Sequence, residues 1–197
     1  MTEHQAPWSK PLLKMIAGAH SPEAAAAFEA YRPDAAAWDT FREVSGEVLQ
    51  DTRLEAGACT ILSALLAKRL TAALNTPMPV IAGALKVGGQ YVFGGNRSFD
   101  GAELFSEGSG DWDGHCWVLF GRHIVDVSLG RTARTGQGHP LLNRTVIAAY
   151  GNQVGLIAAT EAEAREDGLL YLPRYVLRPT QVEALAAGAE YRYGIEA

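Results

Sequence analysis

Cysteine, positive charge and long hydrophobic runs are all scarce in this chain of 197 residues. Its two cysteines, Cys59 and Cys116, cannot supply the set of disulfides that stabilises small secreted domains, so we expect a cytoplasmic, reducing location with both thiols free. The net charge of -5 also lacks the basic excess that binding to nucleic acid or to an anionic membrane requires. Neither partner is therefore expected.

Common targeting and ligand-binding motifs are missing as well. The first 20 residues hold only short apolar patches interrupted by Lys14, which predicts neither a secretory signal nor a membrane span. The glycines fit no phosphate-binding loop, and the cysteines and histidines lack the close spacing of a preformed zinc site. The sequence therefore predicts no cofactor and no metal.

The composition favours one globular domain over residues 1–197. Hydrophobic residues make up 48% of the chain, which is enough for a sizeable core. Residues 1–50 are expected to be helical, because Ser21-Pro22 opens one helix and Asp34 opens another whose apolar residues recur every three to four positions. Residues 51–197 are expected to combine helix and sheet, which makes the fold class α+β.

Cys59 stands near the head of an uncharged run, 57–67, that predicts a buried helix ending at about Asn75. A thiol in the first turn of a helix lies near unpaired backbone N–H groups, which favour the thiolate and lower the pKa of the cysteine. A lowered pKa makes a cysteine a nucleophile. Taken alone, the same pattern also fits a core helix in which Cys59 is a small buried side chain.

After this helix the pattern predicts a β-hairpin and then a long loop. Residues 80–87 and 90–93 are expected to be two strands joined by a turn at Gly88-Gly89. Residues 94–114 are rich in glycine and acidic side chains, which is typical of a loop. If this loop closes over a site, its acids favour a cationic substrate; they also fit a solvated surface loop. The acidic residues are Asp100, Glu103, Glu107, Asp111 and Asp113.

Residues 115–128 predict a second hairpin, with Gly121-Arg122 as its type II′ turn. Counting outward from the turn places several side chains with polar or aromatic groups on one face of the sheet: His115, Trp117, Asp126 and Ser128. His115 and Asp126 become diagonal neighbours, within reach of a hydrogen bond. Cys116 points to the opposite face, away from His115, and is expected to be a buried thiol with no part in the chemistry.

Cys59, His115 and Asp126 are the nucleophile, base and orienting carboxylate that nucleophilic catalysis requires, although a His–Asp pair also occurs for purely structural reasons. The order of a cysteine that starts a buried helix, a His-x-Trp-Val strand and an Asp on the following strand resembles the transglutaminase-like branch of the papain-like superfamily. The resemblance covers roughly residues 57–129.

This resemblance implies a papain-like α+β fold, in which N-terminal helices accompany a central nucleophile helix packed on an antiparallel sheet. It implies a cysteine hydrolase that cleaves an amide, peptide or thioester through an acyl-enzyme on Cys59. An acyl transferase that uses the same triad and a non-catalytic binding domain of the same fold remain open. The substrate is expected to be a small molecule or a peptide.

Two features depart from the family pattern. Cys116 stands where the family commonly has an alanine, and no side chain is a clear counterpart of its oxyanion donor. Gln50, upstream of the nucleophile, and Trp117 are candidates for oxyanion or substrate contacts, and the backbone N–H of Cys59 is a natural oxyanion donor.

The rest of the chain offers no further catalytic candidate. Residues 130–144 are interpreted as a basic loop near the site, and residues 160–167 as a short helix. Residues 169–177 are interpreted as an edge strand, because they include a proline, and Thr180 as the cap of a last helix that ends at Gly188.

Overall fold

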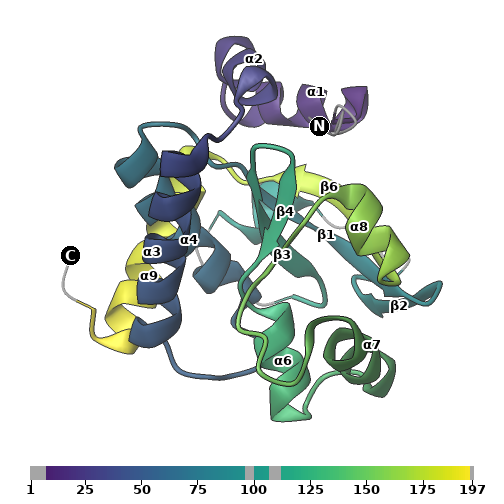
Figure 1. Ribbon diagram of the computed structural model, residues 1–197. Coiled ribbons are helices and arrows are strands. Elements are labelled where there is room, and N and C mark those ends of the chain that lie inside the picture. The colour runs from purple at the N-terminus through teal and green to yellow at the C-terminus, as the bar shows by residue number, and fades with distance from the viewer. Residues whose placement is uncertain (1–7, 96–99, 107–111, 196–197) are drawn as a thin grey trace.

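The computed structural model describes residues 8–95, 100–106 and 112–195. Helices lie on both faces of an antiparallel sheet, which confirms the α+β class (Figure 1). The predicted loop at 94–114 lies partly outside the described residues, and its described part includes the short helix α5, Gly101–Leu104. In the described part of the chain, no helix combines the length and apolarity that a membrane crossing requires.

The first part of the chain is helical, as predicted, and forms α1 (Lys10–Ala19), α2 (Pro22–Ala30) and α3 (Ala35–Asp51). The expected caps are present, because the Ser21 side chain accepts a hydrogen bond from the backbone of Ala24 and the Asp34 side chain accepts one from Ala37.

Helix α4, Cys59–Leu74, begins at Cys59 and ends at Asn75, whose backbone is left-handed. Its apolar surface is covered by α3, by the last helix α9 (Pro179–Tyr193) and by one face of the sheet. This central position explains why the helix has almost no charged residues along its first half.

The sheet is built around strand β1, Val80–Val87, which has different partners on its two edges. Strand β6 (Leu169–Val176) pairs with β1 along one edge. On the other edge, β3 (His115–Phe120) pairs with the first half of β1 and β2 (Gln90–Phe93) with the second half. The end of β2 and the beginning of β3 therefore meet beside the middle of β1.

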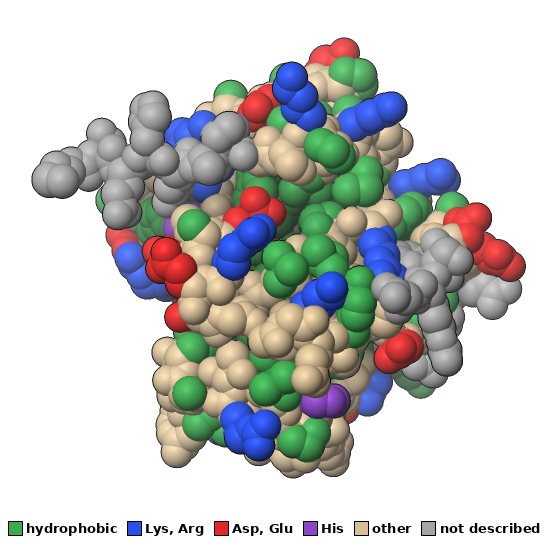
Figure 2. Space-filling view, turned by 90° about the vertical axis from the view of Figure 1, so that its right-hand side faces the viewer, with side chains coloured by type: hydrophobic (Ala, Val, Ile, Leu, Met, Phe, Trp, Pro, Cys, Tyr) green, Lys and Arg blue, Asp and Glu red, His purple; other side chains and the backbone are tan. Residues whose placement is uncertain are grey.

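Beyond β3 the sheet continues with β4 (His123–Asp126) and β5 (Ile157–Ala159). The face opposite α4 is covered by α1 and α2 and by three later helices: α6 (Leu129–Thr135), α7 (Pro140–Tyr150) and α8 (Glu161–Glu166). On the outer surface shown in Figure 2, hydrophobic, basic and acidic side chains are interspersed.

Two predictions about the later chain are wrong. Residues 130–144 are not a loop but contain most of α6 and the start of α7. Gly130 lies within α6, where a Cβ atom would be 2.7 Å from the carbonyl oxygen of Val154, so this glycine permits close packing and does not mark a turn. The last helix begins after Arg178, not after Thr180, and extends beyond Gly188 to Tyr193.

Candidate active site

The β3–β4 hairpin has the register that the sequence predicts, with Phe120 opposite His123 and Val118 opposite Val125. Gly121 in the turn has a φ of 56°, which a glycine adopts without strain. This register places the side chains of His115 and Asp126 on the same face, where Nε2 of His115 lies 2.5 Å from Oδ2 of Asp126. Both side chains are buried.

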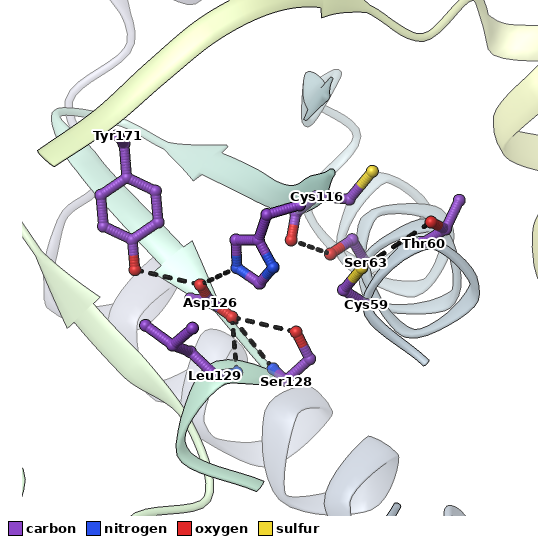
Figure 3. Close-up of polar contacts among 9 residues, drawn as sticks. Cys59, Thr60, Ser63, Cys116, Asp126, Ser128, Leu129 and Tyr171 are labelled. Carbon is purple, nitrogen blue, oxygen red and sulfur yellow. Dashed lines mark hydrogen bonds and ion pairs between the residues drawn. The ribbon is translucent and has the colours of Figure 1, made fainter. Parts of the chain in front are cut away.

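Asp126 has hydrogen-bond donors on both of its carboxylate oxygens (Figure 3). Oδ2 accepts from the hydroxyl of Tyr171 at 3.0 Å, in addition to its contact with His115. Oδ1 accepts from the backbone N–H groups of Ser128 and Leu129 and from the Ser128 hydroxyl, at 2.9 to 3.2 Å. Burial raises the pKa of Asp126, but the positive charge of His115 and these hydrogen bonds outweigh it, so its pKa is lowered and it is ionised.

His115 is enclosed by aromatic rings and carries the opposite charge. Its imidazole stacks on Phe93 at 5.0 Å and lies 6.2 Å from the ring of Trp117. Burial by itself lowers the pKa of His115, but the charge and hydrogen bond of Asp126, together with the interaction with Cys59, raise it to about 10. At neutral pH the ring is therefore an imidazolium.

Cys59 is the first residue of α4, and Ala58 before it provides no side-chain cap for the helix. The Cys59 sulfur interacts with the thiol of Cys116 and with the imidazole of His115, and both hold its pKa well below the ordinary value against the opposing effect of burial. In His115, Nδ1 is buried without a hydrogen bond of normal geometry among the described residues. Because Nε2 faces Asp126, Nδ1 is the nitrogen available to exchange a proton with the thiol.

Cys116 requires a correction to the sequence interpretation. It does point to the face opposite His115 and is fully buried, as predicted. That face, however, is the one on which α4 packs, so its thiol lies beside the Cys59 sulfur and not remote from it. Burial and the neighbouring Cys59 sulfur raise the pKa of Cys116 well above its ordinary value, which leaves it a hydrogen-bond donor.

Cys59 and His115 open into one cavity of about 150 Å³, located where β2 ends and β3 begins. The start of α4, the end of β2, the segment before β3 and helix α6 contribute its walls. The other lining residues are Gly57, Thr60, Phe93, Trp112, Asp113, Gly114 and Thr132.

The other two sequence candidates are not in this cavity. Gln50 is exposed on the last turn of α3, about 200° around the helix from the buried Val48, and does not line the cavity. The position of its side chain therefore gives no support to the predicted role of oxyanion donor. Trp117 is only 1% exposed and contacts His115 and Tyr171, so it forms the wall behind the imidazole and does not reach the cavity.

Sequence reasoning missed two residues that hold this site together. Tyr171 reaches Asp126 from β6, and Arg131 in α6 is buried and donates to the backbone carbonyls of Thr52 and Arg53 in the segment before α4. Neither has a local signal, because each depends on a contact between elements far apart in the chain. Residues 130–144 were interpreted as a loop, so nothing in the sequence indicated that the side chain of Arg131 is buried.

Metal ligands do not gather at this site: within the described ranges, no three His, Cys, Asp or Glu side chains come together as a candidate metal centre. Comparison with protein-family models, curated protein sequences and solved structures found no match.

Proposed function

We propose that this protein is a cysteine hydrolase that forms a covalent acyl-enzyme on Cys59, with a papain-like, transglutaminase-like arrangement of helix and sheet. The observation that carries this proposal is the position of His115, which interacts with the Cys59 thiol and has its Nε2 2.5 Å from Asp126. A nucleophile, a proton carrier and an orienting carboxylate are thus neighbours in space in that order. The first two open into the same cavity.

In the proposed reaction, the Cys59 thiolate attacks the carbonyl carbon of an amide, peptide or thioester. A C–S bond forms while the carbonyl π electrons move to oxygen, and the backbone N–H of Cys59 at the uncapped start of α4 stabilises the oxyanion. As the oxyanion collapses, the bond to the leaving group breaks and His115 donates its proton to that group.

The acyl-enzyme is then cleaved by water. His115, now neutral, accepts a proton from the water as it attacks the thioester, and the departure of the acid restores the thiolate–imidazolium pair. Asp126 holds the ring orientation through both halves and stays ionised throughout. An amine in place of water gives acyl transfer with the same proton steps.

The test is formation of the acyl-enzyme itself. The protein is incubated with p-nitrophenyl acetate, and the acylated residue is identified by mass spectrometry after proteolysis. We expect one acetyl group on Cys59, none in Cys59→Ala, and a strongly reduced rate in His115→Ala. If Cys59→Ala acquires the acetyl group as fast as the unmodified protein does, the proposal is wrong.

A further inference from the structure

The part of the cavity wall next to His115 has a distinct chemistry. Phe93 at the end of β2 and Trp112 before β3 are two aromatic residues of this lining, and the exposed Asp113 lies next to them. Among the described residues that line the cavity, Asp113 is the one charged side chain other than the reacting Cys59 and His115, and no lysine or arginine is present.

Both aromatic rings are held in place by their neighbours. The ring of Phe93 stacks on His115 with an interplanar angle of 16°. The indole of Trp112 packs edge-to-face on Phe105 at 5.8 Å and folds over Gly114, where an added Cβ would lie 2.0 Å from the indole. The aromatic part of the wall therefore exists before any substrate arrives, which reduces the entropic cost of binding against it.

The charges around the cavity favour a positive ligand. The thiolate of Cys59 and the imidazolium of His115 balance each other, and Arg174, which donates to the carbonyls of Gly94 and Gly95 beyond Phe93, adds one positive charge nearby. The carboxylates of Asp126, behind the imidazole, and of the exposed Asp113, beside the cavity, still leave an excess of one negative charge among these five groups. Aromatic rings attract cations through their quadrupole, and a carboxylate pairs with an ammonium or a guanidinium. A cation is thus favoured both by the aromatic rings and by the carboxylate.

We propose that this wall is a cation subsite, and that the enzyme selects acyl substrates that carry an ammonium or guanidinium group near the reacting carbonyl. The inference rests on the proposed function, since it assumes that the carbonyl lies at Cys59. The cavity volume of about 150 Å³ leaves room for more than a single water, which suits one basic side chain beside the carbonyl. Asp113 is the residue that determines specificity in this proposal.

The experiment compares three acyloxymethyl ketones that differ only in the side chain next to the ketone: lysine, its uncharged analogue norleucine, and glutamate. In each, the thiolate displaces the carboxylate leaving group from the methylene carbon, so that a C–S bond replaces a C–O bond. The second-order rate of Cys59 modification is measured by mass spectrometry. Iodoacetamide, which lacks a charged group, corrects each variant for changes in thiol reactivity.

We expect the lysine reagent to react about fivefold faster than the norleucine reagent, and the glutamate reagent to react most slowly. Asp113→Asn should remove most of the preference for lysine over norleucine. The matched control, Glu103→Gln, removes one exposed acidic charge from α5 that does not line the cavity, and should leave the preference intact. High salt should weaken the preference in the unmodified protein.

The outcomes separate the two proposals. Equal rates for the three reagents, or a lysine preference that survives Asp113→Asn, reject the cation subsite while Cys59 remains a nucleophile. Failure of all three ketones to modify Cys59, under conditions in which iodoacetamide does, rejects the proposed attack on acyl substrates.

Discussion

The hydroxyl of Ser63 donates a hydrogen bond of 3.1 Å to the backbone carbonyl oxygen of Cys116 (Figure 3). Ser63 lies four residues after Cys59, on the same side of α4, and Cys116 directly follows His115 on β3. The two residues are 53 positions apart in the sequence. One buried hydrogen bond therefore fixes the helix that carries Cys59 against the strand that carries His115.

Ser63→Ala should lower the free energy of unfolding by about 1–3 kcal/mol, because it leaves the buried carbonyl of Cys116 without its donor. It should also slow alkylation of Cys59 by iodoacetamide, since α4 is then held less firmly against β3. Urea unfolding and alkylation rates measure the two effects. Ser45→Ala is the control, because Ser45 is also buried but its hydroxyl has no partner in the described part of the chain. Equal effects of the two substitutions would contradict the role of Ser63.

Tyr171→Phe should reduce kcat with little change in KM, because it removes a hydrogen bond to the carboxylate that orients His115. With one donor fewer, the pKa of Asp126 should rise, and the acid limb of the pH–rate profile should move to higher pH. The loss of a buried bond to a charged group should cost about 1.5–3 kcal/mol of stability. Tyr175→Phe, on the same strand, is the control: its hydroxyl donates to Gln181 at 3.0 Å and not to Asp126.

The low pKa of Cys59 should depend on the thiol of Cys116. Cys116→Ala removes the neighbouring donor, so we expect the pKa of Cys59 to rise. Cys116→Ser keeps a hydrogen-bond donor in nearly the same volume and should preserve most of the effect. The pH dependence of iodoacetamide alkylation gives the pKa of Cys59 in each protein. If alanine and serine leave it equally unchanged, His115 alone sets the reactivity of Cys59.

The charge pair also predicts how stability varies with pH. Folding raises the pKa of His115 from its ordinary 6.5 to about 10 and lowers that of Cys59 from 9.0. Between about pH 6.5 and 9 the folded pair is imidazolium and thiolate, and the unfolded pair is imidazole and thiol. Both hold one proton, so in this range the pair does not make the free energy of unfolding depend on pH. Below pH 6.5 the unfolded pair holds one proton more than the folded pair, and above pH 9 it holds one fewer. The contribution of the pair to the free energy of unfolding therefore declines in both directions.

Cys59→Ala should change this profile in a specific way. Without the thiolate, the folded state still holds the His115 proton above pH 6.5 while the unfolded state has lost it, so stability should fall as the pH rises. The slope should be at most about 1.4 kcal/mol per pH unit. Urea unfolding of both proteins from pH 6.5 to 9 measures the difference between them. Parallel profiles would mean that Cys59 and His115 do not form a charge pair.

The parts of this fold that sequence reasoning predicted are those determined by local rules. The limits of α4 follow from its apolar run and from Asn75, and the register of the β3–β4 hairpin follows from the turn at Gly121. Because side chains alternate along a strand, that register was enough to place His115 and Asp126 on one face.

What sequence reasoning missed depends on pairings between distant elements. Tyr171 reaches Asp126 because β6 pairs with β1, and nothing near Tyr171 in the sequence signals that pairing. Cys116 was assigned to the correct face, but which helix covers that face is decided by the packing of α4. Gly130 was interpreted as a loop residue because a glycine that permits close contact looks the same in sequence as one that permits a turn.

The pairing of β3 with the first half of β1 also determines when Cys59 and His115 can meet. Cys59 and His115 meet only after β3 has paired with β1 and α4 has packed against that pair. In a chain that is still being synthesised, Cys59 has neither the imidazolium nor the second thiol beside it and behaves as an ordinary cysteine. The pairing of Cys59 with His115 is therefore absent until β1, β3 and α4 have come together.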